Sequence, residues 1–244
     1  MSVIDKILKF KSPVKNYCSV VIVAAGSSQR MGKDKILMQL GDKPVIAHTL
    51  KAFQDSEVID EIVVVTRFES IQEIADICNE YGISKASKIV LGGKTRAESS
   101  LIGVCEASDE ATVIAIHDGA RPFASAELIE RAVSAAYEHN AVTPAVSATD
   151  TVRILNAKGA VTSTPDRDCV MLIQTPQVFN ADIIKGALTK AIEKNTMLTD
   201  DCSAVEAMGV KVTVVAGEQT NIKLTSAMDI YIAEKILADR GAQA

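Results

Sequence analysis

The sequence predicts a three-layer α/β fold, in which helices cover both faces of a mostly parallel β-sheet. Short runs rich in Val and Ile are almost uniformly apolar, which is typical of strands buried on both faces. Longer segments with helical periodicity separate these runs, and such alternation builds right-handed βαβ units. The 244 residues, of which 48% are hydrophobic and 23% charged, suffice for the core of one large domain.

Strand-like and helical segments follow one another from residue 19 onward. The strand-like runs span 19–25, 60–66, 87–92, 112–117, 141–148 and 210–217. The helical segments lie near 44–55, 70–81, 96–107, 125–139, 181–194, 201–208 and 226–240. Thr95 and Glu98 have the spacing of a capping box. Ser226 and Asp229 have the same spacing, and Ser125 can cap the helix that follows it.

Residues 149–168 interrupt this alternation. Short β-prone runs flank the turn-forming sequence at 156–159, which predicts a β-hairpin with little apolar material for a core of its own. Such a hairpin is either a surface flap or an arm that packs on a second subunit, and a two-stranded hairpin is marginal alone. We therefore expect a single domain over 18–244 with a protruding hairpin arm at about 149–168, and a homodimer formed through the arm.

The composition of the chain predicts which partners it has and where in the cell it lies. With 26 basic and 31 acidic residues the net charge is −5, so we expect neither nucleic acid nor a membrane as partner, and local cation clusters must bind any phosphate. The five cysteines are odd in number and form no C-x-x-C pair, which disfavours a disulfide framework and favours the cytoplasm. Residues 1–17 lack the features of a signal peptide and are expected to be an N-terminal extension. No apolar run approaches the ~18 residues of a membrane span.

The loop after the first predicted strand combines small residues with cations. It contains Gly26 and Gly32 together with Arg30, Lys33 and Lys35. Small residues let the backbone approach a ligand, exposed N–H groups can surround phosphate oxygens, and cations neutralise their charge. We expect a ligand here because open α/β sheets bind ligands at the carboxyl ends of their strands.

Two familiar phosphate-binding motifs do not fit this loop. Ser28 occupies the second glycine position of a dinucleotide-binding fingerprint, and no acid ends the second strand. A P-loop would need one residue fewer between Gly26 and Gly32, and Asp34 stands where it needs a hydroxyl side chain. Both alternatives are rejected.

Later loops at the same edge add further polar residues. The paired glycines at 92–93 run into a helix start, which suits an anion or a base edge but equally an ordinary tight turn. Asp118 and Arg121 could bind metal, hydroxyl or phosphate, or form a salt bridge that fixes their loop. Lys223 follows the last strand, where a lysine is usually solvated. Arg153 and Arg167 lie on the arm, and Thr199, Asp200 and Asp201 precede a helix.

Taken together, these motifs resemble those of the 2-C-methyl-D-erythritol 4-phosphate cytidylyltransferase family. The resemblance runs from about residue 20 to about residue 236 and rests on AAGSSQRMG, GGKTRAES, HDGARP, the arm with its Asp-Thr pair, QTPQ, LTDD and NIKLT. It implies a Rossmann-like domain of the nucleotide-diphospho-sugar transferase type that binds CTP, dimerises through the arm and uses a divalent cation, normally Mg²⁺. The implied reaction joins CTP to the sugar-alcohol phosphate 2-C-methyl-D-erythritol 4-phosphate and releases pyrophosphate, in the non-mevalonate isoprenoid pathway. The alternatives are a ribitol 5-phosphate cytidylyltransferase and a catalytically silent nucleotide-binding module.

The resemblance also implies roles for individual residues. Arg30 and Lys35 would stabilise the α-phosphate and the departing pyrophosphate, while Arg167 and Lys223 would position the acceptor. The remaining acceptor-binding residues would be Asp118, Arg121, Thr151 and Thr199. The nucleotide pocket would be formed by Ala24, Ala25, Gly26, Gly93, Lys94 and Ser99, with Mg²⁺ held mainly by the triphosphate. The first loop is shorter than the family pattern, which leaves Lys33 and Lys35 as candidates for the catalytic lysine; Lys35 is favoured because an apolar stretch follows it directly.

Overall fold

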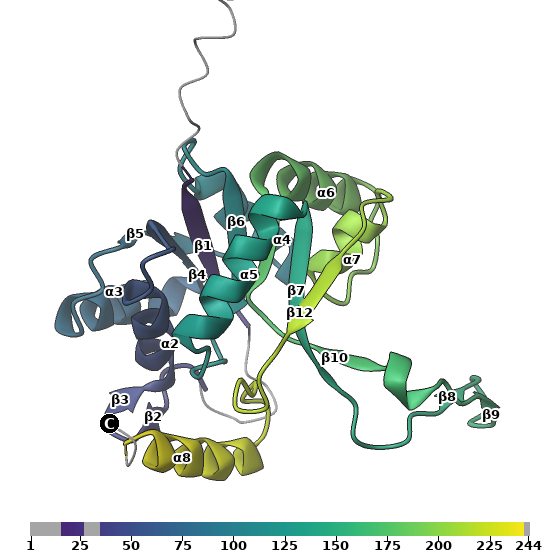
Figure 1. The fold of residues 1–244 in the computed structure, drawn as a ribbon. Coiled ribbons are helices and arrows are strands. Elements are labelled where there is room, and N and C mark those ends of the chain that lie inside the picture. Colours follow the sequence, from purple (N-terminus) through teal and green to yellow (C-terminus); the bar gives the residue numbers. More distant parts are fainter. Residues whose placement is uncertain (1–15, 27–34, 242–244) are drawn as a thin grey trace, which may run out of the picture.

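The centre of the molecule is an eight-stranded sheet with helices on both faces (Figure 1). The structure, a computed structural model, describes residues 16–26 and 35–241. Four strands run parallel in the order β6-β1-β4-β5. Their bounds are Cys18–Val23 (β1), Glu61–Thr66 (β4), Ala86–Leu91 (β5) and Val113–Asp118 (β6). The carboxyl ends of these strands therefore meet at one edge, as a ligand site there requires.

The other half of the sheet is mixed in direction. Its strands are β7 (Ala141–Ser147), β10 (Met171–Ile173), β11 (Gln177–Asn180) and β12 (Thr213–Ala216). Strand β11 pairs antiparallel with both β6 and β7, β10 pairs antiparallel with β7, and β12 pairs parallel with β7. The predicted α/β class with a mostly parallel sheet is confirmed, although β10 and β11 were not predicted because three or four residues show no periodicity.

Helices occur at all seven predicted positions. They are α2 (Val45–Gln54), α3 (Ile71–Glu80), α4 (Arg96–Glu106), α5 (Ala126–Glu138), α6 (Ala181–Glu193), α7 (Asp201–Glu206) and α8 (Ala227–Gly241). The predicted capping box of Thr95 and Glu98 is present, and Ser125 accepts a hydrogen bond from the Leu128 N–H. Asp229 accepts from the Ser226 N–H, as its spacing predicted. Short elements complete the list: β2 (Gln39–Leu40), β3 (Lys43–Pro44), β8 (Ile154–Leu155), β9 (Val161–Ser163) and the 3₁₀ turns η2 (Phe68–Ser70) and η3 (Arg167–Cys169).

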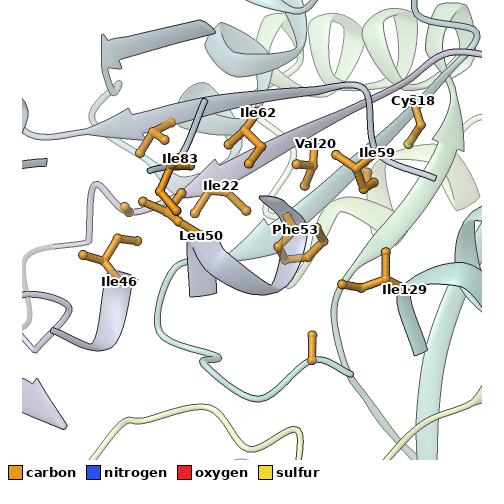
Figure 2. Close-up of a cluster of buried hydrophobic side chains, with 14 of the residues drawn as sticks. Cys18, Val20, Ile22, Ile46, Leu50, Phe53, Ile59, Ile62, Ile83 and Ile129 are labelled. Carbon is orange, nitrogen blue, oxygen red and sulfur yellow. The ribbon is translucent and has the colours of Figure 1, made fainter. Parts of the chain in front are cut away.

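Alternate side chains of the central strands enter two different cores. Val20 and Ile22 of β1 pack with Leu50 and Phe53 of α2 in the cluster shown in Figure 2. Val21, between them, belongs to a second cluster, which is formed with helices α4, α6 and α7. Because both faces of the strand are buried, its residues from Val20 to Val23 are continuously apolar rather than alternating.

The hairpin arm extends away from the body of the molecule (Figure 1). Strands β8 and β9 pair antiparallel, and the turn between them closes through the hydrogen bond from the Asn156 N–H to the Ala160 oxygen at 2.9 Å. Gly159 in this turn has a φ of +80°, which glycine adopts without strain. The side chains of the hairpin are exposed, including Ile154, Leu155 and Val161.

No helix in the described part of the chain is both long and apolar enough to cross a bilayer. The expected N-terminal extension lies almost entirely outside the described residues, which begin at Asn16.

Glu61 is a buried carboxylate at the amino end of β4, at the opposite end of this strand from the candidate site. Its oxygens accept hydrogen bonds from the Ser19 hydroxyl at 2.6 Å, the Ser87 hydroxyl at 2.7 Å and the Ser108 N–H at 2.8 Å. Burial by itself would raise the pKa of Glu61, but these hydrogen bonds outweigh it, and the pKa lies below its ordinary value. Glu61 is therefore ionised at neutral pH and joins β1, β4 and β5.

We expect Glu61→Gln to lower the free energy of unfolding by about 1–3 kcal/mol at pH 7, because an amide cannot accept all three hydrogen bonds. Since folding lowers the pKa, the stabilisation is present above the ordinary glutamate pKa of about 4.3 and is lost as the pH falls below it. Urea unfolding of both proteins between pH 3 and pH 8 should show the difference shrinking toward acid pH. A difference that stays constant with pH would contradict this account.

Candidate active site

Two adjoining cavities lie at the carboxyl ends of β1 and β6. The first has a volume of about 340 Å³ and the second about 330 Å³. The first is lined by Val23, Ala24, Ala25, Gly26, Lys35, Ile36, Lys94, Thr95, Arg96, Ser99, Asp118, Ala120 and Lys223. The second is lined by Arg96, Asp118, Arg121, Ile173, Gln174, Thr175, Gln177, Thr199, Asp200 and Lys223. Arg96, Asp118 and Lys223 line both cavities, and we call these three residues the shared wall.

One side of the first cavity is formed by the turn into α4. The Ser99 hydroxyl accepts a hydrogen bond from the Gly93 N–H at 3.1 Å and donates to the Thr95 oxygen at 2.9 Å. The Glu98 carboxylate accepts from the N–H groups of Lys94 and Thr95. The N–H groups of Gly93, Lys94 and Thr95 are thus bonded within the turn, which favours the tight-turn interpretation of 92–93 over an anion site.

Gly92 fixes the distance between this turn and the first loop. A Cβ atom at Gly92 would lie only 2.6 Å from the Ala25 Cβ and 2.9 Å from the Ser99 Oγ. Only glycine therefore allows the backbone after β5 to approach the Ala24–Ala25 segment this closely. The turn therefore packs directly against Ala25, and both line the first cavity.

Asp118, at the end of β6, is the centre of charge in the site. Its Oδ2 lies 2.9 Å from Lys223 Nζ and 3.3 Å from Arg121 Nε, and its Oδ1 lies 3.4 Å from Arg96 Nη2. Burial alone would raise the pKa of Asp118, but the charges of Lys223, Arg96 and Arg121 outweigh burial and hold it far below its ordinary value. Asp118 is thus ionised at neutral pH, and Lys223 is ion-paired rather than merely solvated.

His117 precedes Asp118 but cannot act as a base in this site. Its Nε2 lies 3.1 Å from the Arg121 carbonyl oxygen, so that nitrogen donates, and its Nδ1 accepts from the Thr175 hydroxyl at 3.0 Å. Complete burial lowers the pKa of His117 to about 4. The neutral ring fixes the loop that carries Asp118 and Arg121.

The second cavity is bounded by the segment before α7. Asp200 caps that helix, because its carboxylate accepts from the Ser203 N–H at 3.0 Å, and it also accepts from the Gln177 side chain at 2.7 Å. The Thr199 hydroxyl lies 2.8 Å from that of Ser203. Gln177, on the unpredicted strand β11, thus organises this side of the site.

The structure brings most of the predicted site residues together, but not all. Ala24, Ala25, Gly26, Lys35, Lys94 and Ser99 line the first cavity, Arg121 and Thr199 line the second, and Asp118 and Lys223 line both. Gly93 lies in the turn beside the first cavity, where its N–H bonds to the Ser99 hydroxyl, and its side of the turn is not part of either cavity lining. Arg167 and Thr151 are exposed on the arm and line neither cavity of this chain. Arg30 and Lys33 lie outside the described residues.

Arg96 and Asp201 form an ion pair beside the cavities, and the sequence prediction gave neither residue a role. Arg96 Nη1 lies 2.6 Å from Asp201 Oδ2 although 105 positions separate the two residues, so no local spacing reveals the pair. Both residues stand inside the quoted motifs GGKTRAES and LTDD, which was the available signal.

This arrangement suits the transfer of a group between two anions. Cations line both cavities, and the shared wall separates two binding spaces that open onto the same carboxylate. The one histidine that adjoins Asp118, His117, is neutral with both ring nitrogens bonded. A reaction here therefore depends on alignment and on electrostatic stabilisation of developing charge.

Comparison with known proteins identifies the family of this chain. The family model described as 2-C-methyl-D-erythritol 4-phosphate cytidylyltransferase matches residues 18–239. A protein of that name from Clostridium botulinum is 39% identical over 221 residues, which cover 90% of this chain and 96% of the relative. One from Halalkalibacterium halodurans is 41% identical over 224 residues, which cover 91% of this chain and 97% of the relative.

Solved structures of proteins from the same family are also similar to this chain. The crystal structure of 4-diphosphocytidyl-2C-methyl-D-erythritol synthase from Anaerococcus prevotii matches with a TM-score of 0.83 and 34% identity, covering 91% of this chain and 96% of that one. The crystal structure of a 2-C-methyl-D-erythritol 4-phosphate cytidylyltransferase from Thermus thermophilus matches with a TM-score of 0.74 and 28% identity, covering 89% of this chain and 98% of that one.

Proposed function

This chain belongs to the 2-C-methyl-D-erythritol 4-phosphate cytidylyltransferase family, and on that premise we propose how its two cavities divide the substrates. The chain is a nucleotidyltransferase of isoprenoid biosynthesis that joins CTP to 2-C-methyl-D-erythritol 4-phosphate. CTP occupies the first cavity and the acceptor phosphate occupies the second. The observation that carries this division is the shared wall, since Lys223 and Arg96 can reach anions in both spaces.

The acceptor needs no general base, because its phosphate is already anionic. One of its oxygens forms a bond to the α-phosphorus of CTP, and the bond from that phosphorus to the bridging oxygen of the β-phosphate breaks. Pyrophosphate leaves with the electron pair of that bond. Lys35 in the first cavity, together with Arg30, stabilises the charge that develops on the α-phosphate and on pyrophosphate. Lys223 holds the acceptor phosphate in line for attack, assisted by Arg121 and Thr199.

A divalent cation, normally Mg²⁺, belongs to this proposal. Among residues 16–26 and 35–241 no group of three or more His, Cys, Asp or Glu side chains could hold a metal ion without help. The site suits instead a cation held mainly by phosphates, because Mg²⁺ commonly binds substrate phosphates, water and one or two carboxylates. Asp118 lines both cavities, but its oxygens already pair with Lys223, Arg121 and Arg96, so the triphosphate itself would hold most of the ion's coordination. When bound, the ion neutralises charge on the triphosphate.

The active form is a homodimer whose arm completes the partner's site. The exposed apolar side chains of the arm, which an isolated hairpin cannot bury, support this proposal. Arg167 and Thr151 would then reach the acceptor bound mainly by the other chain. A cytoplasmic location is supported by the odd number of cysteines without a C-x-x-C pair.

A pyrophosphate-release assay tests the substrate assignment. With Mg²⁺ present, we expect fast release from CTP with 2-C-methyl-D-erythritol 4-phosphate and much slower release when ATP, GTP or UTP replaces CTP. Ribitol 5-phosphate is the critical alternative acceptor, and faster turnover with it would overturn the assignment. Binding of CTP without turnover of either acceptor would indicate a silent nucleotide-binding module.

A further inference from the structure

The ion pair between Arg96 and Asp201 joins the two sides of the site. Its distance of 2.6 Å is shorter than that of any of the three ion pairs that Asp118 forms. The Asp201 side chain is only 1% exposed and lines neither cavity, whereas the Arg96 side chain is 31% exposed and lines both. Asp201 is therefore shielded from a ligand that Arg96 can touch.

The backbone of Asp201 is held in place by the side chain of Gln177. The side-chain oxygen of Gln177 accepts hydrogen bonds from the N–H groups of Asp201 and Cys202, at 3.1 and 3.2 Å. Burial raises the pKa of Asp201, and the charge of Arg96 opposes that rise, so the carboxylate depends on this guanidinium as its counter-ion. The position of Arg96 is in turn set by a carboxylate that cannot move far.

Asp201 also limits how closely Arg96 contacts Asp118, which Lys223 contacts as well. Arg96 contacts Asp118 through Nη2 alone, at 3.4 Å, because Nη1 is bonded to Asp201. Lys223 is closer to Asp118, at 2.9 Å. Without the charge on Asp201, the guanidinium would be drawn to Asp118, its other ion-pair partner among the described residues, and would compete there with Lys223.

We propose that Asp201 is a positioning residue that acts through Arg96. Its buried carboxylate holds the guanidinium on the shared wall, where a phosphate group bound in either cavity can reach it, and keeps the contact of Arg96 with Asp118 longer than that of Lys223. This inference rests on the proposed function and assigns to the reaction a residue pair outside the predicted catalytic set.

The proposal predicts that Asp201→Asn separates binding from turnover. Removing a buried negative charge makes the cavities more positive, so the Kd for CTP stays the same or falls. Misplacing Arg96 should lower kcat by on the order of 10–10²-fold. A merely structural lesion would instead weaken CTP binding and turnover together.

The test is a double-mutant cycle with Asp201→Asn and Arg96→Gln, measured by pyrophosphate release and by calorimetric titration with CTP. If Asp201 acts through Arg96, Asp201→Asn causes no further loss of kcat in the Arg96→Gln background. Glu61→Gln is the matched control, since it also converts a buried carboxylate to an amide but lies outside both cavities, and it should lower Tm without changing kcat.

Three outcomes would overturn the proposal: the same fold-loss from Asp201→Asn in both backgrounds, an unchanged kcat with a lowered Tm as in the control, or equal weakening of CTP binding and turnover. If Asp201→Asn does not fold, Arg96→Lys is tested instead. A lysine keeps the positive charge but cannot bond to Asp118 and Asp201 at the same time as the arginine does. It should bind CTP normally with a lowered kcat, and a wild-type kcat would contradict the proposal. If the wild type turns over neither acceptor, the proposed function fails, and CTP titration still decides the inference: Arg96→Gln must weaken binding while Asp201→Asn must not.

Discussion

Replacing Lys35 with alanine should lower kcat by on the order of 10²–10³-fold while changing the Kd for CTP far less. Lys35 lines the first cavity, and in the proposed reaction its charge is needed most when pyrophosphate departs. A group that stabilises the transition state more than the ground state affects kcat rather than binding. Pyrophosphate-release kinetics and calorimetry with CTP measure the two quantities separately.

The backbone beside Lys35 explains why this lysine is preferred over Lys33. The next residue, Ile36, is buried, and its carbonyl accepts a hydrogen bond from the Ile46 N–H at 2.8 Å. This anchors the chain where Lys35 enters the first cavity. Lys43→Ala, which removes a lysine that lines neither cavity, is the control and should keep the wild-type kcat. A large loss in Lys33→Ala with little change in Lys35→Ala would show that Lys33 is the catalytic residue.

The second large effect concerns the arm. Homodimers of Arg167→Ala and of Lys35→Ala should each be nearly inactive. A purified heterodimer of one chain of each kind should regain about half of the wild-type activity, since one of its two composite sites then carries both lesions and the other carries none. The measurement needs differently tagged chains and pyrophosphate release from the doubly purified species. A heterodimer as inactive as its parents would place Arg167 in the site of its own subunit.

Much of this architecture could be predicted because the deciding signals are local. The run at 62–65 is continuously apolar because β4 is buried on both faces, and the capping box that starts α4 lies within four residues. Strands β10 and β11 could not be predicted, because three or four residues become strands only by pairing with β6 and β7. The ion pair of Arg96 and Asp201 could not be predicted for the same reason, since only the fold brings these two residues together. The proposed roles of Arg167 and Thr151 rest on resemblance, because neither residue lines a cavity of this chain.

The attachment of the arm has a consequence for how this protein can change over time. The chain leaves the sheet at the end of β7 and returns in β10, where Ser147 and Met171 are partners, and the Ala148 N–H still bonds to the Val170 oxygen at 3.0 Å. Everything between is an insertion whose two ends are already joined by the sheet. In the proposed dimer, a longer, shorter or altered arm would change the surface that meets the second copy while the sheet keeps its register. Selection could then adjust subunit recognition separately from the stability of the domain that carries the two cavities.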